Sequence, residues 1–303
     1  MTASISTEGW RTGPVTVSVP ATSANLGPGF DVLGLALDLV DEVTAEVVPD
    51  GYRVEVAGEG AGEVPTGVDH LIVATMLTTF EQLGVARPPG LRLTCHNRIP
   101  HARGLGSSSA AIVAGIALAR ELTTGGSTLD DAAALALAAE IEGHPDNVAP
   151  CLLGGFTIAW TGADGAHAVR LDPADSVTPV VYVPATRGLT AHARAALPTK
   201  VPHRDAVFNT ARAALLVHAL SKAPELLLAA TEDRLHQPYR APAMPETASL
   251  VAELREAGVP AFVSGAGPSV LALTSAPGQR LVDPPTGWWS RSLSCSASGA
   301  RML

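Results

Sequence analysis

The sequence predicts an α+β protein in two parts, and three observations support that prediction. Apolar and polar residues alternate at 15–19 and 35–48, which is typical of half-buried strands. Apolar residues recur at helical spacing at 110–122 and 129–142, and both segments are long enough for helices. Several predicted strands precede the first predicted helix, and strands and helices do not alternate regularly along the chain. We therefore expect an antiparallel first sheet rather than a doubly wound parallel fold.

Composition limits the class of protein. The chain has 303 residues, 47% of them hydrophobic, which is enough for a sizeable core in one large or two ordinary domains. Its formal net charge of −9 argues against nucleic acid or an anionic membrane as the main partner. No apolar run approaches the ~20 residues of a membrane span, and the first segment lacks a signal-peptide core. Three widely spaced cysteines form neither a disulfide framework nor a metal knuckle, so we expect a cytoplasmic protein with reduced thiols.

The remaining elements follow from the same patterns. Strands are expected at 52–56, 91–99, 152–160, near Val169, at 177–183, at 261–264 and on to Leu273. Helices are expected at 70–83, 190–196, 206–221, 225–231 and 247–257. A turn cluster at 161–165 marks the expected boundary between an N-terminal part, 1–163, and a C-terminal part, 164–303.

One segment carries most of the functional information. Residues 104–111 read Gly-Leu-Gly-Ser-Ser-Ser-Ala-Ala and open an alanine-rich helical run. Glycines let the backbone approach a ligand closely, and the free N–H groups at a helix start attract anions. The segment lacks the lysine of the common P-loop and the third glycine of a dinucleotide fold. We expect it to hold a polyphosphate, with Ser108 as a hydroxyl ligand of Mg²⁺; an ordinary helix start with small residues is the alternative.

A carboxylate is expected beside that hydroxyl, because Mg²⁺ takes one or two protein oxygens and keeps several waters. Glu140 and Glu142 end the helix predicted at 129–142 and, being two residues apart, point to different sides of it. Acids at a helix C-terminus oppose its dipole, which favours a specific role over a solvated helix end. We favour Glu142, because it adjoins the polar segment that follows.

That polar segment, Glu-Gly-His-Pro-Asp-Asn at 142–147, breaks the helical pattern and is the second unusual feature. Several hydrogen-bonding side chains fall between an alanine-rich helix and an apolar strand. A functional interpretation places His144 and Asp146 against a small polar substrate. The alternative is an ordinary polar turn in which Asp146 and Asn147 act as caps.

Further candidates lie in other segments. Asn25 and Asp31 flank a Gly-Pro-Gly bend, where an acid on a rigid turn can bind an ammonium group or accept a hydroxyl proton. A tight turn between strands is the alternative there. Ser-Gly-Ala-Gly-Pro-Ser at 264–269 lies between two apolar strands and can close over a phosphate or a substrate hydroxyl. Arg194 and Arg240 carry the planar fork that suits a carboxylate, against the alternative of ordinary surface charge.

In their order along the chain these segments resemble the three motifs of the GHMP small-molecule kinases. The matching segments are Pro-Ala-Thr-Ser-Ala-Asn-Leu-Gly-Pro-Gly-Phe-Asp at 20–31, the glycine-serine segment at 104–110, and 264–269. Within the superfamily the chain is most similar to the homoserine kinase family, through 20–31, 144–150, 154–156 and 190–198. The resemblance spans residues 14 to about 275. It implies an ATP-binding N-terminal domain like ribosomal protein S5 domain 2, and a ferredoxin-like C-terminal domain that completes the substrate site.

The resemblance also implies a reaction and a role for each matched residue. ATP, with Mg²⁺, would phosphorylate the side-chain hydroxyl of L-homoserine to O-phospho-L-homoserine, on the way to threonine. Substrate contacts would come from Asn25, Asp31, His144, Asp146, Arg194, Arg240 and Gly265. ATP contacts would come from Pro100, Arg103, Gly104, Leu105, Gly106, Ser107, Ser108 and Ser109. Relatives are often homodimers, which is the oligomeric state suggested by analogy.

The residue that orients the substrate hydroxyl is left open by the sequence. Some superfamily members use an aspartate–lysine pair as base, but Lys200 and Lys222 are the only lysines and lie outside the motifs. We expect direct in-line transfer, with Asp31, Asp146 and Asn147 as the candidate catalytic groups and Asp146 or Asn147 orienting the hydroxyl. Two other functions stay open: a GHMP kinase for a sugar or mevalonate, and a non-catalytic sensor of a nucleotide or amino acid.

Overall fold

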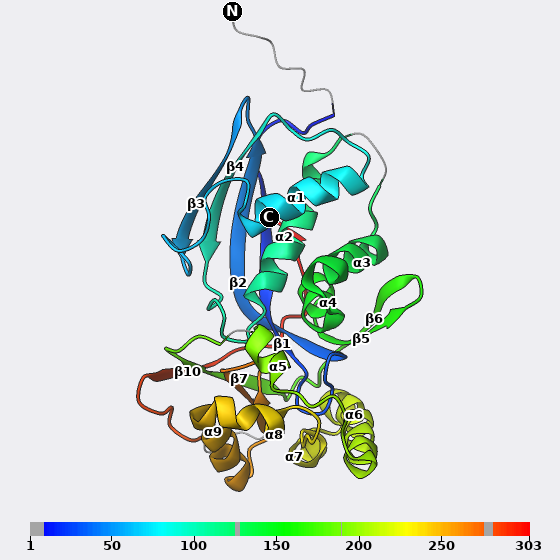
Figure 1. Ribbon diagram of the computed structural model, residues 1–303, viewed down its shortest axis with the longest axis vertical. Helices are drawn as coiled ribbons and strands as arrows, with labels where there is room; N and C mark the ends of the chain where they lie inside the picture. The colour runs from blue at the N-terminus through cyan, green and yellow to red at the C-terminus, as the bar shows by residue number, and fades with distance from the viewer. Residues whose placement is uncertain (1–8, 125–127, 189, 276–280) are drawn as a thin grey trace, which may run out of the picture.

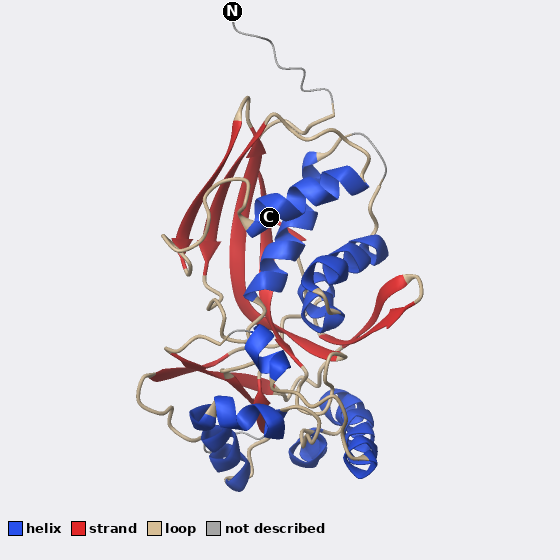
Figure 2. Ribbon diagram, in the orientation of Figure 1, coloured by secondary structure: helices blue, strands red, loops and turns tan. Residues whose placement is uncertain are grey.

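The computed structural model describes residues 9–124, 128–188, 190–275 and 281–303. Within these ranges, helices cover one face of a mainly antiparallel sheet in the N-terminal part, and a smaller sheet with its own helices forms the C-terminal part (Figure 2). None of the described helices is long and apolar enough to cross a bilayer.

The elements alternate irregularly along the chain, as the sequence predicts. The strands are β1 (Val15–Ala24), β2 (Leu33–Val47), β3 (Gly51–Gly58), β4 (Gly90–Asn97), β5 (Phe156–Gly162), β6 (Gly165–Leu171), β7 (Thr178–Pro184), β8 (Ala261–Val263), β9 (Val270–Thr274), β10 (Trp288–Ser292) and β11 (Arg301–Met302). The α-helices are α1 (Leu71–Gln82), α2 (Ser107–Leu122), α3 (Asp131–Glu142), α4 (Pro145–Leu153), α5 (Thr190–Ala195), α6 (His203–Lys222), α7 (Leu227–Ala230), α8 (Gln237–Arg240) and α9 (Pro245–Glu256). Short 3₁₀ turns occupy Pro224–Leu226 and Ala241–Ala243.

The first sheet has the strand order β11-β1-β2-β4-β3, with β5 paired to β2 and β6 to β5. Its described pairs are antiparallel except that of β3 with β4, which is parallel. The prediction of an antiparallel sheet is therefore wrong for that pair. The reason is the crossover through α1, which returns the chain to the same end of the sheet before β4 begins.

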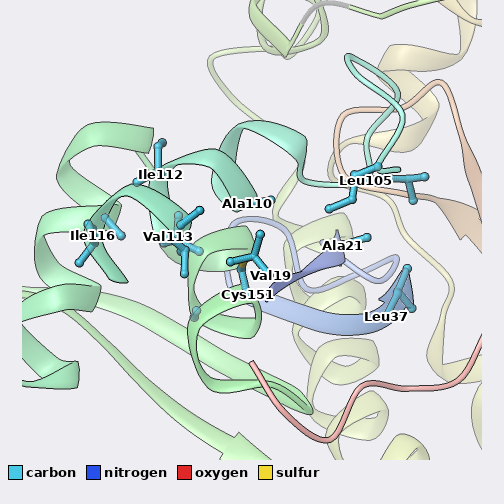
Figure 3. Close-up of a cluster of buried hydrophobic side chains, with 14 of the residues drawn as sticks. Val19, Ala21, Leu37, Leu105, Ala110, Ile112, Val113, Ile116 and Cys151 are labelled. Atoms are coloured by element: carbon cyan, nitrogen blue, oxygen red, sulfur yellow. The ribbon is translucent and has the colours of Figure 1, made fainter. Parts of the chain in front are cut away.

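The core of the first part lies between this sheet and helices α1 to α4, which share one face of it (Figure 1). Helix α2 is buried on most sides. Its Ile112, Val113 and Ile116 belong to the same buried cluster as Val19 of β1 and Leu37 of β2 (Figure 3). Full burial of each such side chain stabilises the fold by roughly 1.5–3 kcal/mol. The start of α2 is thus fixed by the packing of the whole helix.

The segment at 142–147 is more regular than predicted. Gly143, with φ +90°, ends α3, and α4 begins at Pro145, where the sequence predicts a polar turn followed by a strand from residue 152. Proline at the first helical position has its φ already set for a helix and needs no hydrogen bond there. Asp146 and Asn147 therefore lie in the first turn of a helix, which fixes their directions more firmly than a turn would.

The second sheet has the order β10-β7-β9-β8, and α9 packs against it through Leu250 and Leu254. The change of sheet along the chain occurs after β6, because β5 and β6 pair as a hairpin of the first sheet. The boundary predicted at residue 163 falls in the turn of that hairpin, and as a division into domains it stays a prediction. After β10 the chain returns to the first sheet, where Asp38 N donates to Ser294 O and β11 pairs with β1.

Candidate active site

A cavity of about 250 Å³ lies where the N-terminal and C-terminal parts meet. All of the residues predicted to bind the substrate contribute to its lining, together with part of the glycine-serine segment at 104–110 that is predicted to bind phosphate (the phosphate segment). The lining consists of Asn25, Asp31, Ala102, Gly104, Gly106, Ser107, Ser108, Glu142, His144, Asp146, Asn147, Gly188, Arg194, Arg240, Gly265, Ala266 and Gly267. Residues that are far apart in the sequence are thereby brought to one place, although what they bind stays a prediction.

The N-terminus of α2 contributes Gly106, Ser107 and Ser108 to the lining of the cavity. Gly106 precedes the helix with φ +72°, and no described side chain caps the first turn, so its backbone N–H groups are available to an anion. Gly104, with φ +73°, passes so close to Ser264 that a Cβ would lie 2.2 Å from the Ser264 carbonyl oxygen. The hydroxyl of Ser264 also donates to the carbonyl oxygen of Gly104 at 2.6 Å. The glycine-rich segment of the C-terminal part is thus packed directly on the phosphate segment.

Some residues predicted to bind ATP lie outside this described lining. Arg103 donates to three backbone carbonyl oxygens, those of His101 at 3.0 Å, Pro184 at 2.9 Å and Ala185 at 2.8 Å. Its guanidinium therefore ties the phosphate segment to the end of β7. Pro100, which precedes the segment, and Leu105, which lies within it, are buried.

Glu142 meets the first turn of α2. Its Oε1 accepts hydrogen bonds from Ser108 Oγ at 2.7 Å and from Ser109 Oγ at 2.9 Å. Glu140, two residues earlier on α3, is exposed and is absent from the described lining of the cavity. A carboxylate and a hydroxyl side by side at a helix start are oxygen donors of the kind that Mg²⁺ prefers, so the residues present fit that ion.

A second cavity, of about 280 Å³, shares Ser107 and Ser108 with the first and was not predicted. Its walls include Val64, His70 and His101. Burial lowers the pKa of both imidazoles, so they are uncharged at neutral pH. Apolar side chains and neutral imidazoles beside the phosphate segment suit the base and sugar of a nucleotide. The sequence shows this region only as a loop rich in glycine and acids, so nothing local marks it.

Asp41 lies on the same wall of the second cavity. It accepts backbone hydrogen bonds from Arg98 at 2.6 Å and Ile99 at 2.9 Å. Burial nevertheless raises the pKa of its carboxyl to about 6, because the desolvation of the charge outweighs those bonds. The group thereby holds the backbone that leads into the phosphate segment.

Asn25, which also lines the first cavity, joins two of the motifs. Its Nδ2 donates to Gly265 O at 2.8 Å, and its Oδ1 accepts from Asp31 N at 3.0 Å. Asn25 and Asp31 both have positive φ, +69° and +58°, a region that asparagine and aspartate tolerate better than most residues. Helix α5 lies at the junction of the two parts in Figure 1, and both terminal nitrogens of its Arg194 donate hydrogen bonds to the Asp31 carboxylate.

Arg240 is a buried cation that faces the same cavity and is only 2% exposed. Its Nε donates to Ala193 O at 3.1 Å and one terminal nitrogen donates to Gly265 O at 3.3 Å. Burial, and then the charge of Arg194, lowers its pKa, but a guanidinium stays protonated. No described carboxylate forms an ion pair with it. A buried charge without such a partner favours an anionic ligand.

His236 supports Arg240 and was missed by the sequence reasoning. Its side chain is fully buried, its Nδ1 lies 3.2 Å from a terminal nitrogen of Arg240, and its Nε2 lies 2.8 Å from Gly27 O. Burial lowers its pKa, so it is neutral and can accept from Arg240 at Nδ1 while donating to Gly27 at Nε2. Phe30 stacks on its ring, with centroids 5.2 Å apart. No local pattern marks His236, because two of its contacts, with Gly27 and Phe30, come from a distant segment.

Two hydrogen-bonded pairs hold the side chains of His144, Asp146 and Asn147, which line the cavity. His144 Nδ1 lies 2.5 Å from Asp146 Oδ1, and Thr22 Oγ1 donates to Asn147 Oδ1 at 2.8 Å. Burial lowers the pKa of His144, but the hydrogen bond and charge of Asp146, with the charge of Glu142, outweigh it and raise the pKa above 6.5. Asp146 therefore carries a partly charged partner, which weakens it as a proton acceptor.

Comparisons with known proteins give the family. Residues 70–155 match the family described as GHMP kinases N terminal domain, and residues 211–283 match GHMP kinases C terminal. A homoserine kinase of Streptomyces coelicolor is 56% identical over 297 residues, which cover 97% of this chain and 96% of that protein. A homoserine kinase of Clavibacter michiganensis is 58% identical over 88% of this chain and 84% of its own length.

Solved structures agree with the sequence comparison. The crystal structure of homoserine kinase from Cytophaga hutchinsonii matches with a TM-score of 0.83 and 26% identity, over 96% of this chain and 97% of that one. The predicted α+β class and the two-part kinase architecture are thereby confirmed. The chain belongs to the homoserine kinase family of the GHMP kinases.

Proposed function

We propose that this chain transfers the γ-phosphoryl group of ATP to the side-chain hydroxyl of L-homoserine, giving O-phospho-L-homoserine for threonine synthesis. One observation carries the proposal. A single cavity places acidic and guanidinium groups for an amino-acid zwitterion beside an uncapped helix N-terminus for a polyphosphate. The relatives' name, homoserine kinase, supports the same substrate and donor.

The zwitterion would lie at the end of the cavity formed by the C-terminal part. Its ammonium group would bind the Asp31 carboxylate, and its carboxylate would bind Arg240 and Arg194. Arg240 supports this most directly, because it is buried and no described carboxylate forms an ion pair with it. Binding both charged ends at one end of the cavity directs the side-chain hydroxyl toward the start of α2.

ATP would bind with its base and sugar in the second cavity and its phosphates across the first turn of α2. Ser107 and Ser108 line both cavities, which supports one ligand passing between them. Ser108 and Glu142 would hold Mg²⁺, which when bound neutralises charge on the phosphate oxygens. The helix dipole adds roughly half a positive charge at the same place.

The transfer itself is in line. The hydroxyl oxygen forms a bond to the γ-phosphorus as the bond to the bridging oxygen of ADP breaks, and the hydroxyl proton passes to the new phosphate or to solvent. Within the described lining of the cavity there is no lysine, and the Asp146 carboxylate is hydrogen-bonded to His144. Positioning and charge stabilisation therefore supply most of the acceleration, with Asp146 and Asn147 orienting the hydroxyl.

A substrate panel tests the proposal. ATP consumption is measured with homoserine, mevalonate and galactose, and phosphorus NMR identifies the product. We expect turnover with homoserine and a phosphomonoester on its side-chain oxygen. Turnover restricted to another alcohol would assign a different kinase of the superfamily. Binding of homoserine and ATP without turnover with any of the alcohols would indicate a sensor.

The setting of the enzyme is also proposed. We infer that it acts in the cytoplasm, where ATP and amino acids are available, and that it forms a homodimer. Resemblance to its family supports both statements. Sedimentation equilibrium over a range of protein concentrations would measure the mass in solution, and a single species of monomer mass would contradict the dimer.

A further inference from the structure

Thr22 lies beneath the catalytic cavity and contacts two of its segments. It belongs to β1 and is fully buried. Its backbone N–H donates to Leu105 O at 3.1 Å, within the phosphate segment. Its Oγ1 donates to Asn147 Oδ1 at 2.8 Å, across 125 positions of sequence. Thr22 is thus the point at which the first motif, the phosphate segment and the first turn of α4 meet.

This bond decides what Asn147 can offer to a substrate. An asparagine amide accepts through its oxygen, which has two lone pairs, and donates through its nitrogen. The Thr22 hydroxyl binds the oxygen from the protein interior and thereby fixes the orientation of the amide, whose Nδ2 is not among the buried described atoms without a partner; we take Nδ2 as the group offered to the cavity that Asn147 lines. An amide N–H can donate to the attacking hydroxyl oxygen or to a phosphoryl oxygen, but it cannot remove a proton.

The backbone packs closely around the pair. A Cβ on Gly106 would lie 2.0 Å from Thr22 Oγ1 and 3.3 Å from Asn147 Oδ1. The hydroxyl of Thr22 is therefore enclosed between the amide of Asn147 and the residue that begins the phosphate-binding turn. The position of the Asn147 amide relative to the phosphate segment is fixed by this contact.

We propose that Thr22 is a positioning residue for phosphoryl transfer: its hydroxyl holds the Asn147 amide so that Nδ2 donates to the reacting oxygens. The inference rests on the proposed function and adds a residue and a direction of hydrogen bonding to it. Thr22 acts only through Asn147 and touches neither substrate. Asn147 is accordingly a donor and not the base of the reaction.

Four variants test the inference with a double-mutant cycle: Thr22→Val, Thr22→Ser, Asn147→Ala and the Thr22→Val/Asn147→Ala pair. Valine keeps the shape of threonine and removes the hydroxyl, whereas serine keeps the hydroxyl. We expect Thr22→Val to lower kcat about tenfold, with the KM values for ATP and homoserine nearly unchanged. Thr22→Ser should retain most of kcat. In the Asn147→Ala background, Thr22→Val should have no further effect on kcat, because the amide that the Thr22 hydroxyl holds is absent.

Three results would overturn the inference. They are an unchanged kcat in Thr22→Val, a loss in Thr22→Ser equal to that in Thr22→Val, and independent losses that multiply in the double variant. Thermal melting of each variant shows whether it is folded. Asn147→Asp provides a second test that leaves Thr22 intact. It keeps the oxygen that accepts from Thr22 but replaces the donor with a carboxylate oxygen, so we expect kcat to fall at least as far as in Asn147→Ala.

A normal kcat in Asn147→Asp would contradict the donor role. The wild-type substrate panel is run first, so that failure of the proposed function is recognised separately. If another alcohol proves to be the substrate, the same cycle measured with that alcohol still tests the link between Thr22 and Asn147.

Discussion

The Arg194 guanidinium donates two hydrogen bonds to the Asp31 carboxylate, at 3.0 and 2.9 Å. These residues are predicted to bind opposite ends of homoserine, yet in the structure they bind each other. A zwitterion resolves the difference, because its ammonium can replace the guanidinium at Asp31 while its carboxylate takes the place of Asp31 at Arg194. The side chains of Arg194 and Asp31 are 40% and 35% exposed, so each charge stays in contact with solvent while the partners exchange.

Replacing Arg194 by lysine tests this exchange. Lysine keeps the charge but not the two-pronged geometry that a carboxylate prefers. We expect the KM for homoserine to rise about tenfold or more, and the KM for ATP to change little. Steady-state kinetics with each substrate varied in turn gives both constants. An equal rise in both KM values would contradict a role limited to homoserine.

Glu142 and Glu140 provide a matched pair of variants for testing the magnesium site. Both lie at the C-terminal end of α3, but their side chains point to different sides of the helix. Only Glu142 accepts from Ser108 and Ser109. In Glu142→Gln we expect the Mg²⁺ concentration for half-maximal activity to rise about tenfold. Glu140→Gln should behave as the wild type. Equal Mg²⁺ requirements for the two variants would place the metal elsewhere.

The His144–Asp146 pair should make stability depend on pH. The raised pKa of His144 means that the folded state holds its proton more tightly than the unfolded chain. Its stabilisation is therefore fully present below the unfolded pKa of 6.5 and is lost as pH rises through the higher folded pKa. We expect the stability difference between wild type and His144→Gln, measured by urea unfolding, to shrink from about pH 6 to about pH 9. A difference that grows over this range would be contrary to the expectation.

Alanine substitutions at Gly106 and Gly143 distinguish steric crowding around a new Cβ from the cost of a positive φ. Both have positive φ, +72° and +90°, so alanine at either position costs about 1–2 kcal/mol. A Cβ at Gly143 meets nothing within 4 Å, whereas one at Gly106 meets the Thr22 hydroxyl. We expect Gly106→Ala to lower the melting temperature more than Gly143→Ala does, and to raise the KM for ATP. Equal melting temperatures for the two variants would show that neighbouring atoms move away from the new Cβ at position 106 at little cost.

The sequence predicts those parts of the site whose geometry is local. The start of α2 follows from the glycines and serines themselves, and the directions of Glu140 and Glu142 follow from helical spacing. Asp146 and Asn147 line the cavity, while their predicted roles stay predictions. The helix that carries them is not predicted, because the segment at 143–147 is expected to break the helical pattern, whereas α4 begins within it at Pro145.

Contacts between distant segments could not be predicted. The bonds of His236 to Gly27 and of Thr22 to Asn147 join residues 209 and 125 positions apart, and no spacing rule relates them. The parallel pairing of β3 with β4 likewise depends on where α1 packs. The contacts of Arg103 also depend on the fold, because it donates to the carbonyl oxygens of Pro184 and Ala185 in a distant segment. Its predicted role as a ligand for ATP stays a prediction.

A crystal structure with homoserine and a nonhydrolysable ATP analogue tests the central claim most directly. We predict phosphates on the backbone N–H groups at the start of α2, the base in the cavity beside His70 and His101, and the homoserine carboxylate on Arg240. Its hydroxyl should face the γ-phosphate. A nucleotide bound elsewhere, with the start of α2 in contact only with protein, would contradict the account.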